Sequence, residues 1–184
     1  MKYVVEQSQE FIDGMIDILT RNKALKVKDT DVLKKDFSKR RALSFEEFLI
    51  DEHLVSKPAL LKALKEYYNV PAVDVLGHFF EHNLVIMIPK DVQMRYCFIP
   101  YARDGNILAV VAANPNHPEL PEVIGRHVSY DIAFMVGYFR DIRDAIEEFY
   151  ARAITEVPQD IELRAEKEEE HALEQITEEE DLIE

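Results

Sequence analysis

Two histidines four residues apart are the pair of side chains in this sequence best spaced for chemistry. His78 and His82 lie in the segment GHFFEH. On a helix this spacing would place both imidazoles on one face, where they could bind a metal ion together with one more ligand. The sequence has no HExxH motif and no nearby cysteine to supply that ligand. We therefore interpret both histidines as structural or solvated side chains and predict no metal site.

The other reactive side chains also lack the neighbours that catalysis needs. Cys97, the one cysteine, lies in the apolar run YCFIPYA without a base beside it, which indicates a buried thiol rather than a nucleophile. The carboxylate pairs Glu46-Glu47 and Glu147-Glu148 are interpreted as solvated charge on helix surfaces. Neither the phosphate-binding GxxxxGK(S/T) pattern nor the dinucleotide-binding GxGxxG pattern occurs. We predict that the chain is not an enzyme and binds no cofactor.

The net charge of −14 is concentrated at the C-terminal end. Residues 155–184 hold 13 acidic and two basic side chains, whereas the preceding residues are nearly balanced. The basic cluster over residues 34–41 is interrupted by Asp36 and is typical of a solvated linker. Because nucleic-acid binding requires clustered Lys and Arg that neutralise phosphates, we predict no nucleic-acid partner. Residues 155–184 are interpreted as an acidic linker or tail.

The composition also indicates where the protein is located. No apolar run approaches the roughly 20 residues that span a bilayer, and the N-terminus lacks the basic and apolar segments of a signal peptide. A lone cysteine cannot form an internal disulfide framework. We therefore predict a cytoplasmic protein without direct membrane insertion.

The first third of the chain has the periodicity of short amphipathic helices. Apolar residues of SQEFIDGMIDIL recur at helical spacing, with Ser8 available as the N-cap, and a weaker helical pattern surrounds Leu33. Ser44 and Glu47 form a capping box that predicts a helix beginning at Phe45. A further helix should follow Ser56 as its cap, with a proline in the first turn.

These helices form two similar halves. Aligning Leu19 with Leu49 also places Ile16 on Glu46, and the pair 24–25 on the pair 54–55. The apolar skeleton and the turn position are shared, which suggests a duplicated helix pair. Two such pairs would form a small helical bundle.

After residue 70 the periodicity changes to that of a small sheet. The dipeptide Asp104-Gly105 predicts a hairpin over about 97–113, and the apolar run 130–136 predicts a third strand. Short helices are expected over 89–95 and ending near Gly125, followed by a longer helix over 140–154. The fold class is α+β: an N-terminal helical bundle followed by a three-stranded sheet, with the helices expected on one face.

With these elements and spacings the chain resembles a known family, the N-terminal domain of type II secretion and type IV pilus assembly ATPases (the GspE N-terminal or MshEN domain). The resemblance covers roughly residues 44–150, and it implies a module over 44–154 that is preceded by an N-terminal helical segment, 1–43. The matching family positions are Ile88-Pro89, Arg95-Tyr96, Ile99-Pro100, Ala112-Ala113-Asn114-Pro115 and Tyr150.

The resemblance implies a ligand motif that this chain has lost in part. Some members of the family bind cyclic di-GMP through tandem copies of RLGxxLVxxGxLxxxxLxxxLxxQ. The apolar positions of the motif are retained from Phe45 to Leu64, but Ser44 replaces its Arg, Glu46 and His53 replace its glycines, and Tyr67 replaces its Gln. Loss of the cation and gain of a carboxylate both oppose a dianionic ligand. We predict no cyclic di-GMP binding of the ordinary kind.

The resemblance then favours a non-catalytic protein-docking or regulatory module, and a cyclic di-GMP sensor is the alternative. The implied partner is the cytoplasmic domain of an inner-membrane secretion or pilus platform protein, or a secretion ATPase, which would hold the chain peripherally at the inner membrane. Tyr68 and Phe79 are the candidate anchors for a partner, although burial in the core would explain the same residues.

Overall fold

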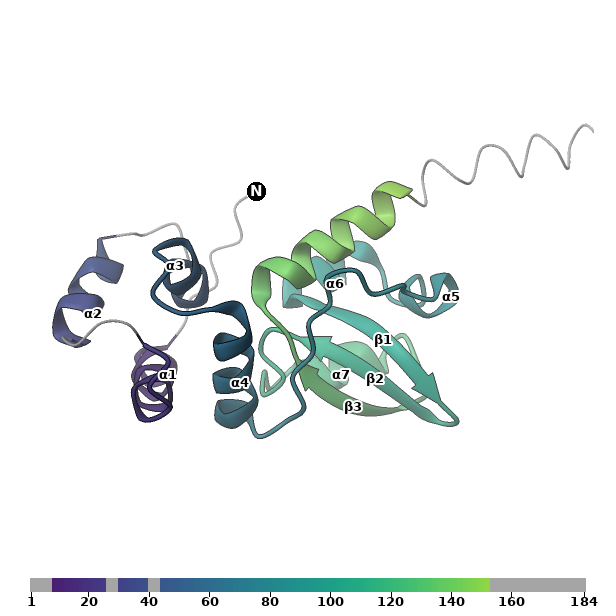
Figure 1. The fold of residues 1–184 in the computed structure, drawn as a ribbon. Coiled ribbons are helices and arrows are strands. Elements are labelled where there is room, and N and C mark those ends of the chain that lie inside the picture. Colours follow the sequence, from purple (N-terminus) through teal and green to yellow (C-terminus); the bar gives the residue numbers. More distant parts are fainter. Residues whose placement is uncertain (1–7, 26–29, 40–43, 153–184) are drawn as a thin grey trace, which may run out of the picture. The chain divides into compact units, whose positions relative to one another are not determined.

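The computed structural model describes residues 8–25, 30–39 and 44–152, and the chain divides into two compact units, 1–146 and 147–184. Figure 1 shows the helices of the N-terminal half followed by a small sheet with its own helices. The elements are α1 (Gln9–Arg21), α2 (Thr30–Ser38), α3 (Phe45–Asp51), α4 (Lys57–Tyr68), α5 (His82–Val85), α6 (Lys90–Tyr96), β1 (Phe98–Asp104), β2 (Ile107–Ala112), α7 (Leu120–Gly125) and β3 (Asp131–Val136). Residues 139–152 form a last helix, of which 147–152 belong to the second unit.

The predicted caps determine where two of the N-terminal helices begin. At α1, Ser8 Oγ accepts a hydrogen bond from the Phe11 N–H at 3.2 Å. At α3 the capping box is complete, because Ser44 Oγ accepts from the Glu47 N–H at 3.2 Å while Glu47 Oε2 accepts from the Ser44 N–H at 2.9 Å. Ser56 is the N-cap residue of α4 as expected, but its side chain makes no capping hydrogen bond.

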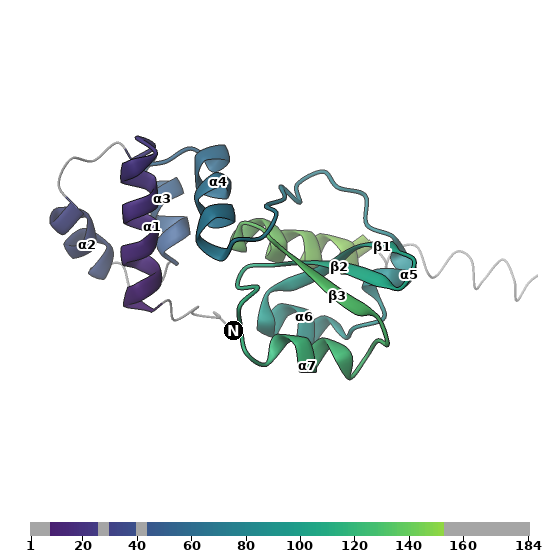
Figure 2. The same ribbon diagram turned by 90° about the horizontal axis from the view of Figure 1, so that it is seen from below.

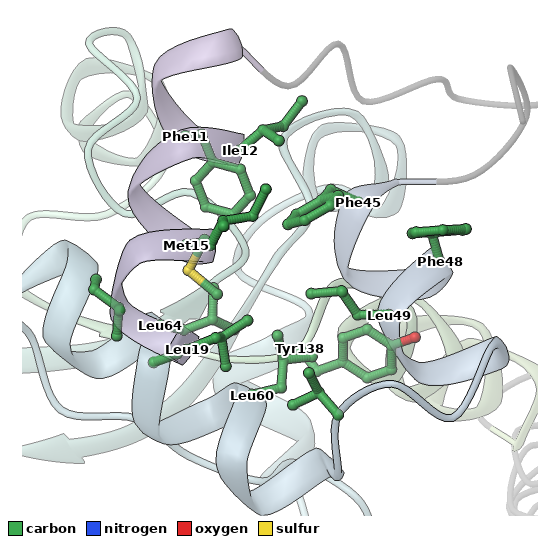
Figure 3. Packing of buried hydrophobic residues seen from close by; sticks show 14 of the residues in the cluster. Phe11, Ile12, Met15, Leu19, Phe45, Phe48, Leu49, Leu60, Leu64 and Tyr138 are labelled. Carbon is green, nitrogen blue, oxygen red and sulfur yellow. The ribbon is translucent and has the colours of Figure 1, made fainter. Parts of the chain in front are cut away.

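One apolar core joins these helices, and Figure 3 shows part of it from close by. Side chains from α1, α3 and α4 point toward one another there, and Tyr138, which follows β3, packs among them. The buried members shown with labels are Phe11, Ile12, Met15, Leu19, Phe45, Phe48, Leu49, Leu60, Leu64 and Tyr138. The helical half and the end of β3 therefore share this core.

The turns after α1 and α3 share one pattern of backbone hydrogen bonds. After α1 the N–H groups of Ala24 and Leu25 donate to the Leu19 carbonyl at 2.9 and 3.3 Å, and after α3 those of residues 54 and 55 donate to the Leu49 carbonyl at the same two distances. Lys23 and His53 occupy the left-handed region at the equivalent position, with φ of 53° and 55°. The two turns thus have the same helix-ending geometry.

The sheet has the order β1-β2-β3, with β1 and β2 antiparallel and β2 and β3 parallel. The predicted hairpin and third strand are confirmed, but the two turn residues are Gly105 and Asn106 rather than Asp104 and Gly105, because Asp104 pairs with Ile107. Gly105 has φ of 56°, which suits the first central position of a type II′ turn.

The expectation that helices cover only one face of the sheet is wrong. On one face, core side chains of β1 and β2 pack with those of α6 and α7. On the other face Val111 is fully buried, and a Cβ built at Gly137 would contact both Val111 and Ile142 of the last helix. Figure 2 shows α6 and α7 on one side of the strands and the beginning of the last helix on the other. Among the described residues, no helix combines the length and apolar composition that crossing a membrane requires.

Candidate functional site

Ser44, at the first position of the motif, caps the N-terminus of its own helix, α3. It is buried, and its hydroxyl and backbone N–H form the two hydrogen bonds of the α3 capping box. A hydroxyl used as an N-cap supplies neither the charge nor the reach of the arginine that the family motif has at this position.

Glu46, at the first glycine position of the motif, faces the interior. Only 2% of its surface is exposed. Burial raises the pKa of the Tyr68 hydroxyl well above its ordinary value, and the negative charge of Glu46 raises that pKa further. A carboxylate therefore lies beside the C-terminal end of α4, where a glycine would have left open space and no charge.

His53, at the second glycine position, is exposed and adopts the left-handed backbone conformation, with φ of 55°. Its Nδ1 lies 3.0 Å from the Asp51 carbonyl oxygen. The backbone conformation is therefore a second explanation for the glycine that the motif has at this position, besides close approach of a ligand. Glycine adopts the left-handed conformation without steric cost. The side chain of His53 adds bulk outside the core.

Tyr67, at the final position of the motif, packs against α1. Its ring meets Phe11 edge-on at a centroid distance of 5.1 Å and Tyr68 at 5.0 Å. A Cβ built at Gly14 would lie 2.6 Å from Tyr67 Cε2, so the ring lies directly against the α1 backbone at that residue. Gly14 is the position of the first half that corresponds to Ser44. Sequence comparison of the halves could have identified Gly14, but not its contact with Tyr67.

Arg140, in the helix that follows the sheet, pairs with two acidic residues of α3. Arg140 donates from Nη1 and Nη2 to the two carboxylate oxygens of Asp51 at 3.0 Å each, and from Nε to Glu47 at 3.3 Å. The hydrogen bonds to Asp51 raise the pKa of the guanidinium above its ordinary value, and the charge of Glu47 adds to this effect. Two carboxylates already pair with this cation, which makes it a poor phosphate ligand.

The two candidate anchors lie in very different surroundings. Tyr68 is half-buried, and its ring lies 6.0 Å from that of Phe11, so it belongs to the helical core. Phe79 is 90% exposed. Exposure of this degree for a large aromatic side chain is compatible with a role as an anchor.

The residues first considered for chemistry do not form a reactive site. His78 lies outside any helix and stacks on Tyr101 at 4.0 Å, whereas His82 begins α5, so the two imidazoles do not share a helix face. Cys97 is buried, its Sγ donates to the Phe139 carbonyl at 3.6 Å, and burial raises the pKa of the thiol well above its usual value. Within the described ranges no group of three or more His, Cys, Asp or Glu side chains could hold a metal ion.

Comparison with known proteins identifies relatives in one class. Residues 68–156 match the model of the MshEN domain. Over 103 residues the chain is 26% identical to the type IV pilus assembly ATPase PilB of Myxococcus xanthus (strain DK1622), a match that covers 56% of this chain and 18% of that relative. The matched part thus spans less than a fifth of the curated relative.

Two solved structures have the same fold. The structure of MshE with cdg has a TM-score of 0.57 at 17% identity and covers 74% of this chain and 98% of that one. The N-terminal domain of XpsE has a TM-score of 0.53 at 18% identity, with coverages of 78% and 97%.

Proposed function

We propose that the chain is a non-catalytic protein-docking module, because residues 68–156 match the model of the MshEN domain and the chain is similar to a type IV pilus assembly ATPase. Its helical half keeps the apolar scaffold of the family's ligand motif. The module proposed for docking is the segment 44–154, with 1–43 as a degenerate first helix pair and 155–184 as an acidic tether.

The observation that supports docking over nucleotide sensing is the filling of the motif's ligand positions. Glu46 places a buried carboxylate at one glycine position, and Tyr67 packs against the α1 backbone at Gly14. A dianionic ligand would meet a negative charge and an aromatic ring where the motif has space and a cation. We therefore infer that this scaffold, which lacks the ligand contacts of the motif, binds protein.

The proposed partner is the cytoplasmic domain of an inner-membrane platform protein of a secretion or pilus system, or a secretion ATPase. Such a partner would place the chain in the cytoplasm, peripherally at the inner membrane. Phe79 is the better candidate anchor, because Tyr68 lies against the helical core.

The alternative, a cyclic di-GMP sensor, has one specific observation in its favour: the likeness to MshE, whose structure was solved with cdg. Isothermal titration calorimetry separates the two proposals. We expect no heat of binding when the full chain is titrated with cyclic di-GMP, because the motif positions oppose a dianion. Micromolar or tighter binding would overturn the docking proposal in favour of sensing.

Docking itself is measured with purified cytoplasmic domains of platform proteins immobilised on a biosensor. We expect saturable binding of the full chain that weakens at least about tenfold in Phe79→Ser, since an exposed aromatic anchor dominates such contacts. The matched control is Ile107→Ser, which removes another exposed apolar side chain. Equal binding by wild type and both variants would exclude Phe79 as the anchor, and no binding to any platform or motor protein would reject docking.

A further inference from the structure

The sequence holds two Asp-Gly dipeptides, and the fold places them in opposite surroundings. Asp13-Gly14 lies inside α1, whereas Asp104-Gly105 lies at the tip of the β1–β2 hairpin. An Asp-Gly pair is chemically reactive, because glycine has no Cβ to shield its amide nitrogen, and that nitrogen can attack the Asp Cγ to close a five-membered ring. Closure depends on access to both atoms and on the freedom of the backbone between them.

The hairpin tip leaves both reacting groups accessible. Residues 104–107 are exposed, and the tip lies at the end of the sheet away from α4 (Figure 1). A Cβ built at Gly105 would meet no atom within 4 Å apart from its chain neighbours, so nothing crowds the nitrogen. Within the described residues the Gly105 N–H donates to no acceptor, and the Asp104 carboxylate has neither an ion pair nor a hydrogen bond.

Ring closure at the tip disturbs little of the fold. Rotation about the ψ angle of Asp104 interrupts its pairing with Ile107, which is the last pair of the hairpin ladder. Local openings at an exposed turn lie at the low end of the free energies that a native protein shows. The hydrogen bond from Asn106 Nδ2 to Asp131 at 3.1 Å holds the other side of the turn, so the movement is confined to residues 104 and 105.

The dipeptide Asp13-Gly14 is protected against the same reaction. Helix α1 fixes the ψ angle of Asp13 and directs the Gly14 N–H to the carbonyl four residues before it. Asp13 Oδ1 accepts hydrogen bonds from Lys34 Nζ at 2.8 Å and from Gln9 Nε2 at 2.9 Å. A Cβ built at Gly14 would lie 2.6 Å from Tyr67 Cε2, so the tyrosine ring also crowds this glycine.

We propose that Asp104-Gly105 is a site of spontaneous isoaspartate formation in the folded protein. The Gly105 nitrogen bonds to Asp104 Cγ, and one water molecule leaves, formed from the carboxyl OH and the amide hydrogen. Water then opens the ring. Hydrolysis at Cγ restores aspartate, whereas hydrolysis at the main-chain carbonyl carbon leaves Gly105 linked through Cγ and frees an α-carboxylate. These steps together change neither the mass nor the oxidation state of the chain.

The product alters the hairpin. In isoaspartate the main chain passes through Cβ and Cγ, so it is one carbon atom longer between residues 104 and 105. A two-residue turn requires the normal spacing, and the ladder pair of Asp104 with Ile107 is therefore lost. The neighbouring residue, Arg103, donates to Tyr130 Oη at 2.9 Å, so the change lies beside a contact between β1 and the start of β3.

Storage of the full chain at neutral pH and physiological temperature tests the proposal. Electron-transfer fragmentation of peptides from the stored protein distinguishes isoaspartate from aspartate at each position. We expect isoaspartate to accumulate at residue 104 at least about tenfold faster than at residue 13, because α1 must open before the second site can react. In urea both sites should react at similar rates.

Three outcomes of this experiment would overturn the proposal. They are equal rates at the two sites in the folded protein, no isoaspartate at residue 104, and a difference in urea as large as that in the folded protein. The last would assign the difference to neighbouring residues rather than to the fold. None of them bears on the biosensor test with platform proteins, which decides the docking function separately.

Asparagine variants measure the same ring closure on the intact chain. In Asp104→Asn and Asp13→Asn the ring closes with loss of ammonia and opens with water, so each event leaves an acid in place of an amide and raises the mass. We expect the mass of Asp104→Asn to rise at least about tenfold faster than that of Asp13→Asn, with wild type correcting for the other amides. Asp104→Glu, whose longer side chain cannot form the five-membered ring, should give no isomer at residue 104. Thermal unfolding shows whether each variant is folded, and equal rates in the two folded asparagine variants would contradict the proposal.

Discussion

At the scale of single residues, the Tyr67 ring fills the space beside Gly14 on α1. We predict that Gly14→Ala destabilises the protein by about 1–3 kcal/mol, because the new Cβ would lie 2.6 Å from Tyr67 Cε2 and force the ring to move. Alanine's better helix propensity, worth about 1 kcal/mol, opposes this loss and does not cancel it. Urea unfolding followed by circular dichroism measures the difference.

Gly125→Ala is the matched control for this prediction. Gly125 is the last residue of α7, and a Cβ there would meet no other atom within 4 Å. This variant should be unchanged or slightly more stable, by up to about 1 kcal/mol. In the background Tyr67→Ala, the cost of Gly14→Ala should disappear. If the cost persists without the ring, Tyr67 does not close this space.

At the scale of elements, the similar turns after α1 and α3 each place a non-glycine residue in the left-handed conformation. We predict that Lys23→Gly and His53→Gly each stabilise the protein by about 1 kcal/mol, because glycine adopts the observed φ values of 53° and 55° without steric cost. The free energy of unfolding in urea provides the measurement.

The opposite effect is expected where the backbone is right-handed. Lys35→Gly, within α2, should destabilise the protein by up to about 1 kcal/mol, because glycine there only adds conformational entropy to the unfolded chain. Destabilisation by both turn substitutions would show that the lysine and histidine side chains contribute more than the backbone conformation costs.

The elements that the sequence predicted well are those whose signals are local. Ser8 and the Ser44-Glu47 box lie within one turn of the helix starts that they determine, and Gly105 lies in the tight turn of its hairpin. Amphipathic spacing likewise identified the buried residues of α1 and α4.

Features that depend on contacts between distant segments could not be predicted in this way. The position of the last helix on the second sheet face follows from packing of Ile142 near Val111, which no local pattern encodes. The motif alignment gave the residue types at the ligand positions, but the aromatic ring that fills the space beside Gly14 comes from the end of α4. His78 was considered on a helix, whereas its stacking on Tyr101 belongs to an irregular turn.

At the scale of the whole first unit, ion pairs accompany the shared core in joining the helices to the segments around the sheet. Lys57, at the first turn of α4, lies 2.9 Å from Asp74 Oδ1 and 2.5 Å from Asp141 Oδ2. Asp141 is buried, and burial raises the pKa of its carboxyl even though the hydrogen bond from Lys57 acts to lower it. For Asp74 burial also acts to raise the pKa, but the hydrogen bonds from Lys57 and the Leu76 N–H outweigh it and lower the pKa overall.

Removal of the lysine should therefore produce a pH-dependent loss of stability. We predict that Lys57→Met lowers the free energy of unfolding by about 2–3 kcal/mol at pH 7, because Asp141 is left as a buried carboxylate without its cation. An acid whose pKa is raised on folding loses stability as pH rises from its unfolded value, about 3.9, through its folded value. The deficit of Lys57→Met should thus shrink as pH falls toward 4. The part of the deficit that comes from losing the Lys57–Asp74 pair also becomes smaller as pH falls. Urea unfolding across this pH range measures both effects.

The double variant Lys57→Met/Asp141→Asn isolates the buried carboxylate as the cause. It should recover most of the loss at pH 7 and show little of the pH dependence, since the group that titrates is gone. Lys34→Met, which breaks the exposed Lys34–Asp13 pair, is the control and should change the free energy of unfolding little between pH 7 and pH 4, because the pair is exposed and the lowered pKa of Asp13 acts below this range. A Lys57→Met deficit that stays constant from pH 7 to pH 4, or that the double variant fails to recover, would mean that Lys57 stabilises the unit through packing of its aliphatic stem. In that case the Lys57–Asp141 pair would contribute no net stability, and the Arg140 pairs with Asp51 and Glu47 would be the ion pairs that join α3 to the segment after the sheet.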